Sequence, residues 1–299
     1  MNMSVDFLGK TFKNPIVMAS GTFGSGMEYS GFVDLNRLGG IVTKGVSITP
    51  WEGNDAPRIA ETRSGMLNAI GLQNPGAEVF AGRDIPFLSD FDTVKIVNLC
   101  GHTVDEYVQV AERLNDEPVD MFELNISCPN VKEGGIGFGT DPEAAAGVVS
   151  AVKKISKKPV IAKLSPNVTD ITVIAKAVEA AGADAVSLIN TITGMKIDVN
   201  KRRPVLANVT GGLSGPAIHP VAVRMCYQVS RAVDIPIIGG GGVDDAESAL
   251  EMILAGASLV SIGTATFSRP DICLGIISDM ETFLLVHDCM DIKDFKLLF

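Results

Sequence analysis

The sequence predicts an α/β protein that folds as a (β/α)8 TIM barrel with long loop insertions at the C-terminal face. Three observations support this prediction. Short apolar runs alternate with longer helical patterns along the 299 residues, which is typical of parallel strands joined by right-handed crossovers. The runs are apolar at nearly every position, as expected for strands buried on both faces. There are eight such units, the number that closes this barrel.

In chain order, the expected strands span residues 16–20, 40–44, 94–99, 121–127, 160–165, 185–190, 236–240 and 259–263. The expected helices span residues 28–36, 74–85, 103–114, 141–156, 169–181, 217–232, 244–255 and 270–287. An open doubly wound sheet is the alternative, but it favours an early Gly-x-Gly-x-x-Gly helix start, and no convincing one is present. Because no linker rich in Pro, Gly and Ser interrupts the pattern, residues 1–299 are expected to form a single domain.

Several helix ends carry local signals. Thr103 with Glu106, and Thr140 with Glu143, fit capping boxes. Pro142 suits the first position of the fourth helix. That helix ends in lysines, which the negative end of its dipole favours: Lys153, Lys154, Lys157 and Lys158.

Two connections are unusually long for this fold. Residues 46–74 follow the second strand and residues 191–216 follow the sixth. Long ordered loops in compact domains are often functional. Both loops leave the carboxyl ends of strands, where barrel enzymes place their sites, so both are expected to contribute to a site.

Composition excludes several classes of protein. The net charge is −10, from 25 Lys+Arg against 35 Asp+Glu, which argues against nucleic-acid binding. No apolar stretch approaches the roughly 20 residues of a membrane span, and no signal peptide or lipidation motif is present. The five cysteines form no Cys-x-x-Cys pair, so we expect a reduced, cytoplasmic protein without a metal site. Of the three histidines, His102 and His219 follow loops but have no ligand spacing, and we interpret both as structural.

Polar residues gather where the expected strands end. Because the ends of parallel strands share one rim, four Asn and two Lys are expected to converge there: Lys44, Asn98, Asn125, Asn130, Lys163 and Asn190. A lysine in a barrel mouth is unfavourable unless it meets an anion or reaches solvent. Gly241-Gly242 and Gly263-Thr264 leave the last two strands, the usual place of a phosphate site in such barrels. Tight turns without a ligand are the alternative for these glycines.

Cys128 is the candidate catalytic residue. It follows a strand end, precedes Pro129 and lies between Asn125 and Asn130. No histidine is nearby in the sequence, so it is expected to act as a proton acceptor rather than as half of a Cys–His pair. An inert, buried thiol is the alternative.

Together these segments resemble the dihydroorotate dehydrogenases, flavin enzymes of pyrimidine synthesis on an (α/β)8 barrel. The match covers nearly the whole chain, and its most specific pieces are residues 19–24, 43–45, 68–76, 125–130, 212–215, 239–243 and 262–264. Cys128 is typical of class 1, and residues 68–76 and 130–135 look like class 1B. That class implies an electron-transfer partner subunit that carries FAD and a two-iron two-sulfur cluster and reduces NAD, around a homodimeric core within a heterotetramer. Class 1A, a fumarate-using homodimer, is the nearest alternative.

The resemblance also implies which residues bind each ligand. FMN contacts map to Ser20, Lys44, Gly45, Asn98, Asn125, Lys163, Ile189, Gly215, Gly241, Gly242, Gly263 and Thr264. Contacts to dihydroorotate or orotate map to Lys44, Asn68, Ala69, Ile70, Gly71, Leu72, Asn125, Asn190 and Thr191. In the implied mechanism Cys128 takes a proton from C5 of dihydroorotate while a hydride moves from C6 to FMN.

Two other readings of the same features are weaker. A dihydrouridine synthase is also an FMN barrel with a catalytic cysteine, but it needs a surface for tRNA, which the acidic charge disfavours. A non-catalytic barrel that serves as a binding or scaffold subunit would not need Cys128, Lys163 and both glycine loops together. Flavin colour in the purified protein distinguishes this last alternative.

Overall fold

The computed structural model of this chain describes residues 1–127, 132–133 and 136–295. At its centre a closed barrel has eight parallel strands, which confirms the predicted fold. In chain order they are β3 (Ile16–Met18), β4 (Gly40–Val42), β7 (Val94–Leu99), β8 (Met121–Leu124), β11 (Val160–Lys163), β12 (Ala185–Leu188), β17 (Ile237–Gly240) and β18 (Leu259–Ile262). Most of them end up to three residues before the sequence suggested. Of the polar residues of the rim, Asn98 and Lys163 therefore lie within their strands, whereas Lys44, Asn125 and Asn190 belong to the loops that follow.

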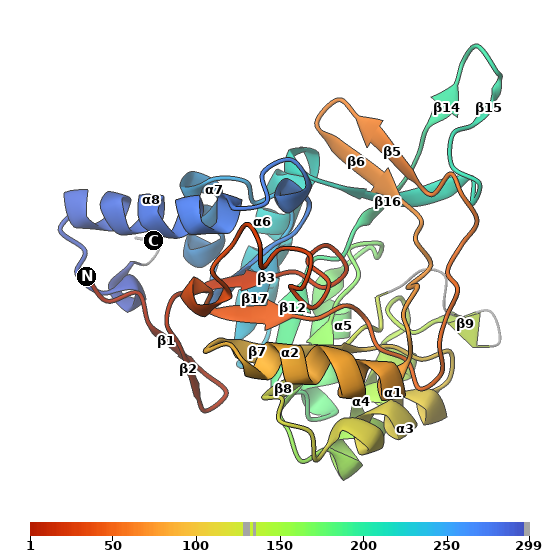
Figure 1. Cartoon of the computed structure of the whole chain (residues 1–299), viewed down its shortest axis with the longest axis horizontal. Helices are drawn as coiled ribbons and strands as arrows, with labels where there is room; N and C mark the ends of the chain where they lie inside the picture. Colours follow the sequence, from red (N-terminus) through yellow and green to blue (C-terminus); the bar gives the residue numbers. More distant parts are fainter. Residues whose placement is uncertain (128–131, 134–135, 296–299) are drawn as a thin grey trace.

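Helices cover the outside of the barrel (Figure 1). Six predicted helices are confirmed: α3 (Val104–Leu114), α4 (Pro142–Ile155), α5 (Ile171–Ala180), α6 (His219–Ser230), α7 (Ala246–Leu254) and α8 (Ile272–Val286). Their buried faces are apolar, and the buried side chains of α4, for example, are Ala145, Val148, Val149 and Val152. The core of the protein thus lies inside the barrel and between the barrel and its helices.

One helix prediction was wrong, and the bounds of another differ from those expected. Residues 28–36 form turns and a short 3-10 helix, η1 (Leu35–Arg37), because the chain enters this loop through glycines at positive φ and Asp34 caps a single turn. The helix expected over 74–85 begins later and runs further, as α1 (Ala77–Val79), a π-helical turn η2 (Phe80–Asp84) and α2 (Ile85–Ser89). Gly76, at φ 83°, delays its start.

The helix caps were predicted in part. Thr103 accepts the Glu106 N–H as expected, but the Glu106 carboxylate accepts the N–H of His102 rather than that of Thr103. The cap of α4 is Asp141, not Thr140, because the Asp141 carboxylate reaches the Ala144 N–H at 2.8 Å. Pro142 occupies the start of α4 as predicted.

The two long loops pair with each other, which the sequence did not reveal. Residues 46–74 supply β5 (Ile59–Thr62) and β6 (Gly65–Asn68), and residues 191–216 supply β13 (Ile192–Met195) and β16 (Thr210–Ser214). They form one antiparallel sheet in the order β13-β16-β6-β5, which we call the arm sheet. A hairpin of β14 (Ile197–Asp198) and β15 (Arg203–Pro204) extends it, and the arm projects from one end of the barrel (Figure 1).

Short elements complete the fold. The hairpin of β1 (Val5–Phe7) and β2 (Lys10–Phe12) packs the Phe12 ring against Gly40, the first residue of β4, and so covers the amino end of the barrel. The remaining elements are β9 (Lys132–Glu133), β10 (Ile136–Gly137), η3 (Pro216–Ile218), η4 (Thr264–Phe267) and η5 (Ile292–Asp294). With the amino end covered, the carboxyl end is left for a site.

Candidate active site

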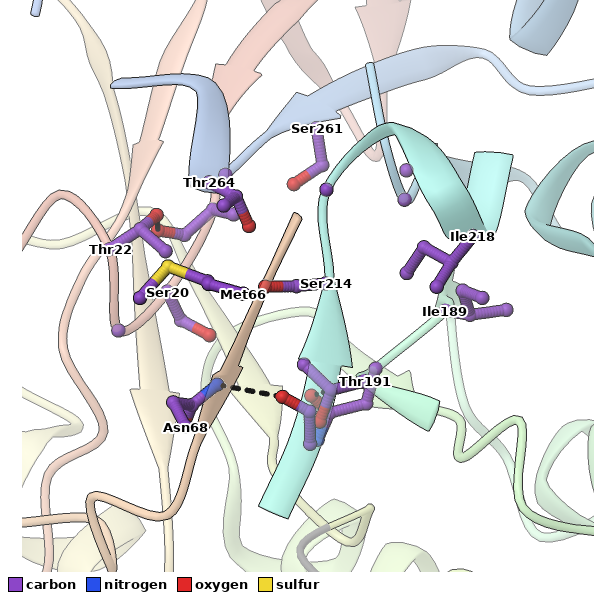
Figure 2. Close-up of a pocket in the computed structure, with 18 of the residues that line it drawn as sticks. Ser20, Thr22, Met66, Asn68, Ile189, Thr191, Ser214, Ile218, Ser261 and Thr264 are labelled. Carbon is purple, nitrogen blue, oxygen red and sulfur yellow. Dashed lines mark hydrogen bonds between the residues drawn. The ribbon is translucent and has the colours of Figure 1, made fainter. Parts of the chain in front are cut away.

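A cavity of about 900 Å³ opens at the carboxyl ends of the barrel strands. Barrel loops line one side and the arm sheet lines the other. Figure 2 shows Ser20, Thr22 and Thr264 from the barrel loops near Met66 of β6, with Ile189 and Ile218 across the space. The volume lies in the range of small-molecule and cofactor sites.

The structure brings most of the predicted site residues together at this cavity. All of the described candidates but one line it: Ser20, Lys44, Gly45, Asn68, Ala69, Ile70, Gly71, Leu72, Asn125, Lys163, Ile189, Asn190, Thr191, Gly215, Gly241, Gly242, Gly263 and Thr264. The exception, Asn98, is fully buried one layer behind the wall. Cys128, the predicted base, lies outside the described residues, as does Asn130.

Lys163 is held at the bottom of the cavity by two partners. Its ammonium donates to the Ser20 hydroxyl at 3.0 Å and lies 3.8 Å from a carboxylate oxygen of Glu123. The Lys163 side chain is 13% exposed and that of Glu123 is 3% exposed. Two opposite charges so far from water interact strongly, so Lys163 is fixed in position rather than extended into solvent.

Glu123 is the residue that the sequence analysis missed. Both of its oxygens accept hydrogen bonds, one from the Asn98 amide and one from the Ser187 hydroxyl, each at 2.6 Å. A signal was available, because an acidic residue inside the apolar strand β8 needs a buried partner.

From Glu123 a chain of hydrogen bonds runs along the rim. The Asn125 amide donates to Asn98 Oδ1 at 3.2 Å, and the Ser127 hydroxyl donates to Asn125 Oδ1 at 3.1 Å. Asn190 in turn donates to the Ser127 hydroxyl at 2.7 Å. Because Glu123 can only accept, it fixes which end of each amide donates. The site thus presents amides of set polarity next to the position of Cys128 in the chain.

Two glycine-containing loops form the other end of the cavity. Gly241 and Gly242 both have positive φ, at 131° and 73°, which few other residues adopt. Within the described part of the chain, no hydrogen-bond acceptor is found for the N–H groups of Gly242, Val243 and Thr264 in these loops. N–H groups that converge on a cavity without acceptors suit an anion.

The start of α7 is closed rather than open to a ligand. Asp245 accepts the Ser248 N–H at 2.8 Å, and Ser248 bonds back to the N–H of Asp245, so its capping box satisfies this helix end itself. The loop amides before α7 and at the start of η4 are therefore better placed to meet an anion than this capped helix end.

On the arm side, the wall consists of side chains from both insertions. Asn68 on β6 donates to the Gly212 carbonyl on β16 at 3.4 Å (Figure 2, dashed line). Gly212 must be glycine, because a Cβ there would lie 1.9 Å from the Thr191 hydroxyl. Thr191 thus packs directly against the arm sheet. This contact ties the loop after β12 to the insertion that carries the predicted substrate residues 68–72.

The other cysteines and histidines have different surroundings. Burial raises the pKa of the Cys226 thiol to about 12 and that of Cys273 to about 11, so neither is a ready thiolate. His102 stacks on Trp51 with ring centroids 4.0 Å apart. His219 contacts the Gly241 loop of the cavity.

Neither a membrane helix nor a metal cluster occurs in the part of the chain that the structure describes. No helix there is long and apolar enough to cross a bilayer. Likewise, the described His, Cys, Asp and Glu residues include no group of three or more that could hold a metal ion.

The fold and the cavity together define a (β/α)8-barrel enzyme with a site of ligand size at the carboxyl ends of its strands. Comparison with known proteins identifies the family of this enzyme. The family model for dihydroorotate dehydrogenase matches residues 2–284. The chain therefore belongs to the dihydroorotate dehydrogenase family, which confirms the resemblance found in the sequence.

Individual relatives cover nearly the whole chain. The protein is 62% identical over 294 residues to dihydroorotate dehydrogenase B (NAD(+)), catalytic subunit, of Lachnoclostridium phytofermentans, with 98% of each chain covered. It is 55% identical over 296 residues to the protein of the same name from Alkaliphilus metalliredigens, covering 99% of this chain and 98% of that one. The Geobacter sulfurreducens protein of that name is 55% identical over 294 residues, covering 98% and 96%.

Proposed function

We propose that this chain, acting as one FMN-binding barrel domain, oxidises dihydroorotate to orotate in pyrimidine (UMP) biosynthesis. The observation that carries the proposal is the cavity. Residues far apart in the sequence, which the family resemblance assigns to flavin and substrate, line one space of about 900 Å³. The family match over residues 2–284 supports the same activity.

The residues present fit FMN. The acceptor-free N–H groups of Gly242, Val243 and Thr264 suit its phosphate. At the other end of the cavity, Lys163 offers a positive charge to the edge of the ring that becomes negative on reduction. Bound FMN supplies the acceptor for the hydride that leaves C6 of dihydroorotate.

The polar rim and the arm fit the substrate. Orotate presents a carboxylate and a ring of amide donors and acceptors, which Lys44 and the Asn side chains of the cavity can match. Asn125 and Asn190 are held in one orientation by the hydrogen-bond chain that begins at Glu123. Cys128 is proposed to take the proton from C5.

The electrons are proposed to leave through a partner subunit that carries FAD and a two-iron two-sulfur cluster and reduces NAD. The relatives' names, with "B (NAD(+))" and "catalytic subunit", support this assignment. The chain itself offers no Gly-x-Gly-x-x-Gly turn that opens a βαβ unit for a nicotinamide. A homodimeric core in the cytoplasm is proposed with it, and five exposed apolar side chains of the arm region suit such a contact: Ile59, Met195, Ile197, Val199 and Val209.

Steady-state turnover of the purified chain tests the proposal. The chain alone should carry a yellow flavin that dihydroorotate bleaches, yet it should reduce NAD slowly until the partner subunit is added. A colourless chain that FMN cannot reconstitute contradicts the enzyme assignment. Fast NAD reduction without a partner contradicts the two-subunit assignment. Fast fumarate reduction instead assigns the chain to class 1A.

A further inference from the structure

The His219 side chain contacts the backbone of the loop that contains Gly241 and Gly242, and it does not line the cavity. It is the first residue of α6, and its side chain is only 11% exposed. Its Nδ1 lies 2.8 Å from the Gly241 carbonyl oxygen, and its Nε2 lies 3.0 Å from a carboxylate oxygen of Glu251 on α7. The imidazole thus bridges the loop and the helix that follows it.

The chemistry of the two partners fixes the role of each ring nitrogen. A carbonyl oxygen and an ionised carboxylate only accept hydrogen bonds. Nδ1 therefore donates to the Gly241 carbonyl, while Nε2 faces the Glu251 carboxylate. Other charged groups nearby are Asp245 on the α7 cap and Arg269, which donates to the Asp244 carbonyl. The two contacts together leave the ring one orientation.

Fixing the direction of a carbonyl also fixes the direction of the N–H group in the same peptide unit. In a planar trans peptide the carbonyl of Gly241 and the N–H of Gly242 point in opposite directions. Since the Gly241 carbonyl points to His219, the Gly242 N–H points away from it. Gly242 lines the cavity, and its N–H has no acceptor among the described residues.

We propose that His219 is a positioning residue that holds the Gly241–Gly242 peptide with its N–H toward the cavity, and thereby selects a flavin that carries a phosphate. This inference rests on the proposed function, in which the phosphate of FMN lies at this loop. His219 itself does not touch the ligand in this proposal. It acts through the backbone.

The test compares FMN with riboflavin, which lacks the phosphate, on flavin-stripped enzyme. An asparagine side chain carries its amide nitrogen as far from Cβ as a histidine carries Nδ1, so His219→Asn keeps a donor for Gly241 and loses the contact with Glu251. His219→Gln places its nitrogen at the Nε2 position and loses the contact with Gly241. Fluorescence titration should show FMN affinity about tenfold lower in His219→Gln and His219→Ala, near normal in His219→Asn, and riboflavin affinity unchanged throughout.

Two kinds of result would overturn the inference. One is an equal loss of FMN and riboflavin affinity, which indicates a general structural role. The other is full FMN affinity in both His219→Gln and His219→Ala, or rescue by Gln rather than Asn. If His219→Ala does not fold, the comparison of His219→Gln with His219→Asn retains the test.

A matched control comes from a second histidine with the same kind of bond. His287 Nδ1 lies 2.8 Å from the Phe283 carbonyl at the end of α8, and no described residue of α8 lines the cavity. His287→Ala should leave both flavin affinities unchanged, and a tenfold loss there would remove the specificity on which the inference depends. If the unaltered enzyme binds FMN no better than riboflavin, the phosphate site itself is wrong. If it prefers FMN but the variants keep that preference, only the role of His219 is wrong.

Discussion

The two walls of the cavity are built from different parts of the chain. On the barrel wall, the loops after β17 and β18 present backbone N–H groups, and glycines at positive φ shape the first of these loops. On the arm wall, the insertions after β4 and β12 present side chains such as Asn68 and Thr191. The barrel wall therefore depends on the conformation of the backbone, whereas the arm wall depends on the identity of individual side chains.

This difference suggests that the barrel wall retains the cofactor and that the arm wall recognises the substrate. A backbone surface suits a ligand that must stay bound, because its shape depends on the fold rather than on any one side chain. A side-chain surface suits recognition of a ring that enters and leaves at each turnover. Changes to the barrel wall should therefore affect cofactor retention, and changes on the substrate side should affect turnover.

The largest effect is expected from Cys128→Ala. Without the base, flavin reduction by dihydroorotate should slow by a factor of at least about 10² in a stopped-flow experiment. FMN should remain bound and orotate should still bind, since neither wall is altered. Cys128→Ser should be intermediate and should improve at high pH, because a hydroxyl is a weaker acid than a thiol.

Near-normal reduction of Cys128→Ala at neutral pH would assign the proton transfer to another group. Loss of FMN from this variant would instead contradict the assignment of cofactor binding and turnover to different parts of the site.

Gly242→Ala is the complementary change on the barrel wall. A Cβ here would lie 2.7 Å from the Gly215 carbonyl oxygen and 2.8 Å from His219 Cβ, and φ is +73°. Strain of this kind is worth roughly 1–3 kcal/mol, so FMN affinity should fall about tenfold or more while any enzyme that retains FMN reduces it at a normal rate. Gly147→Ala in α4, where a Cβ meets nothing within 4 Å, is the control and should keep its flavin. Unchanged FMN affinity in Gly242→Ala would mean that this loop does not hold the cofactor.

The barrel wall could be predicted from the sequence because its signals are local. A glycine pair follows one buried apolar strand and Gly263-Thr264 follows the next, and each signal lies within a few residues of its own strand. Both long loops were expected at the site, but their pairing into the arm wall could not be predicted, since β6 pairs with β16 across more than 140 residues, as in the contact of Asn68 with Gly212. Its strands are short and rich in glycine, so they lack a clear two-residue alternation.

The same reasoning explains the errors within the barrel. Asp141 competes with Thr140 as the cap of α4, and only the backbone geometry decides between them. Glu123 is readable as an unusual residue in a strand, but its partners Asn98, Lys163 and Ser187 come from three other strands. Side-chain networks across a barrel depend on strand register, which a single sequence does not specify.

On the arm wall, Asn68→Ala should have a moderate effect. The change removes an amide that faces the cavity and its bond to Gly212 at 3.4 Å, which is long for a hydrogen bond. The KM for dihydroorotate should rise about tenfold, as for one lost polar contact, while the FMN content stays normal. Steady-state kinetics and the flavin absorbance of the purified variant measure the two separately. A loss of FMN with an unchanged KM would mean that the arm wall holds the cofactor rather than the substrate.

The smallest effect concerns Asp245, which caps α7 behind the barrel wall without lining the cavity. Burial raises the pKa of its carboxyl, but hydrogen bonds from the Ser248 N–H and hydroxyl, with the charges of His219 and Arg269, outweigh burial and lower it below 3.8. Asp245→Ala should lower the free energy of unfolding at pH 7 by about 1 kcal/mol and the Tm by about 2 °C.

The pH dependence of that effect follows from the lowered pKa. A carboxyl whose pKa is lower in the folded state contributes stability above its unfolded pKa, and the contribution is lost as the pH falls through the folded value. The Tm difference between the unaltered protein and Asp245→Ala should therefore be constant from pH 7 to about pH 5 and should shrink below about pH 4. Asp245→Asn, which keeps an acceptor without the charge, should show a smaller difference that varies less with pH. Thermal unfolding across this range, with the bound flavin measured in parallel, would contradict the assignment if the difference grew in acid. Loss of FMN from Asp245→Ala as readily as from Gly242→Ala would also contradict the assignment, because the cap would then act as part of the barrel wall rather than behind it.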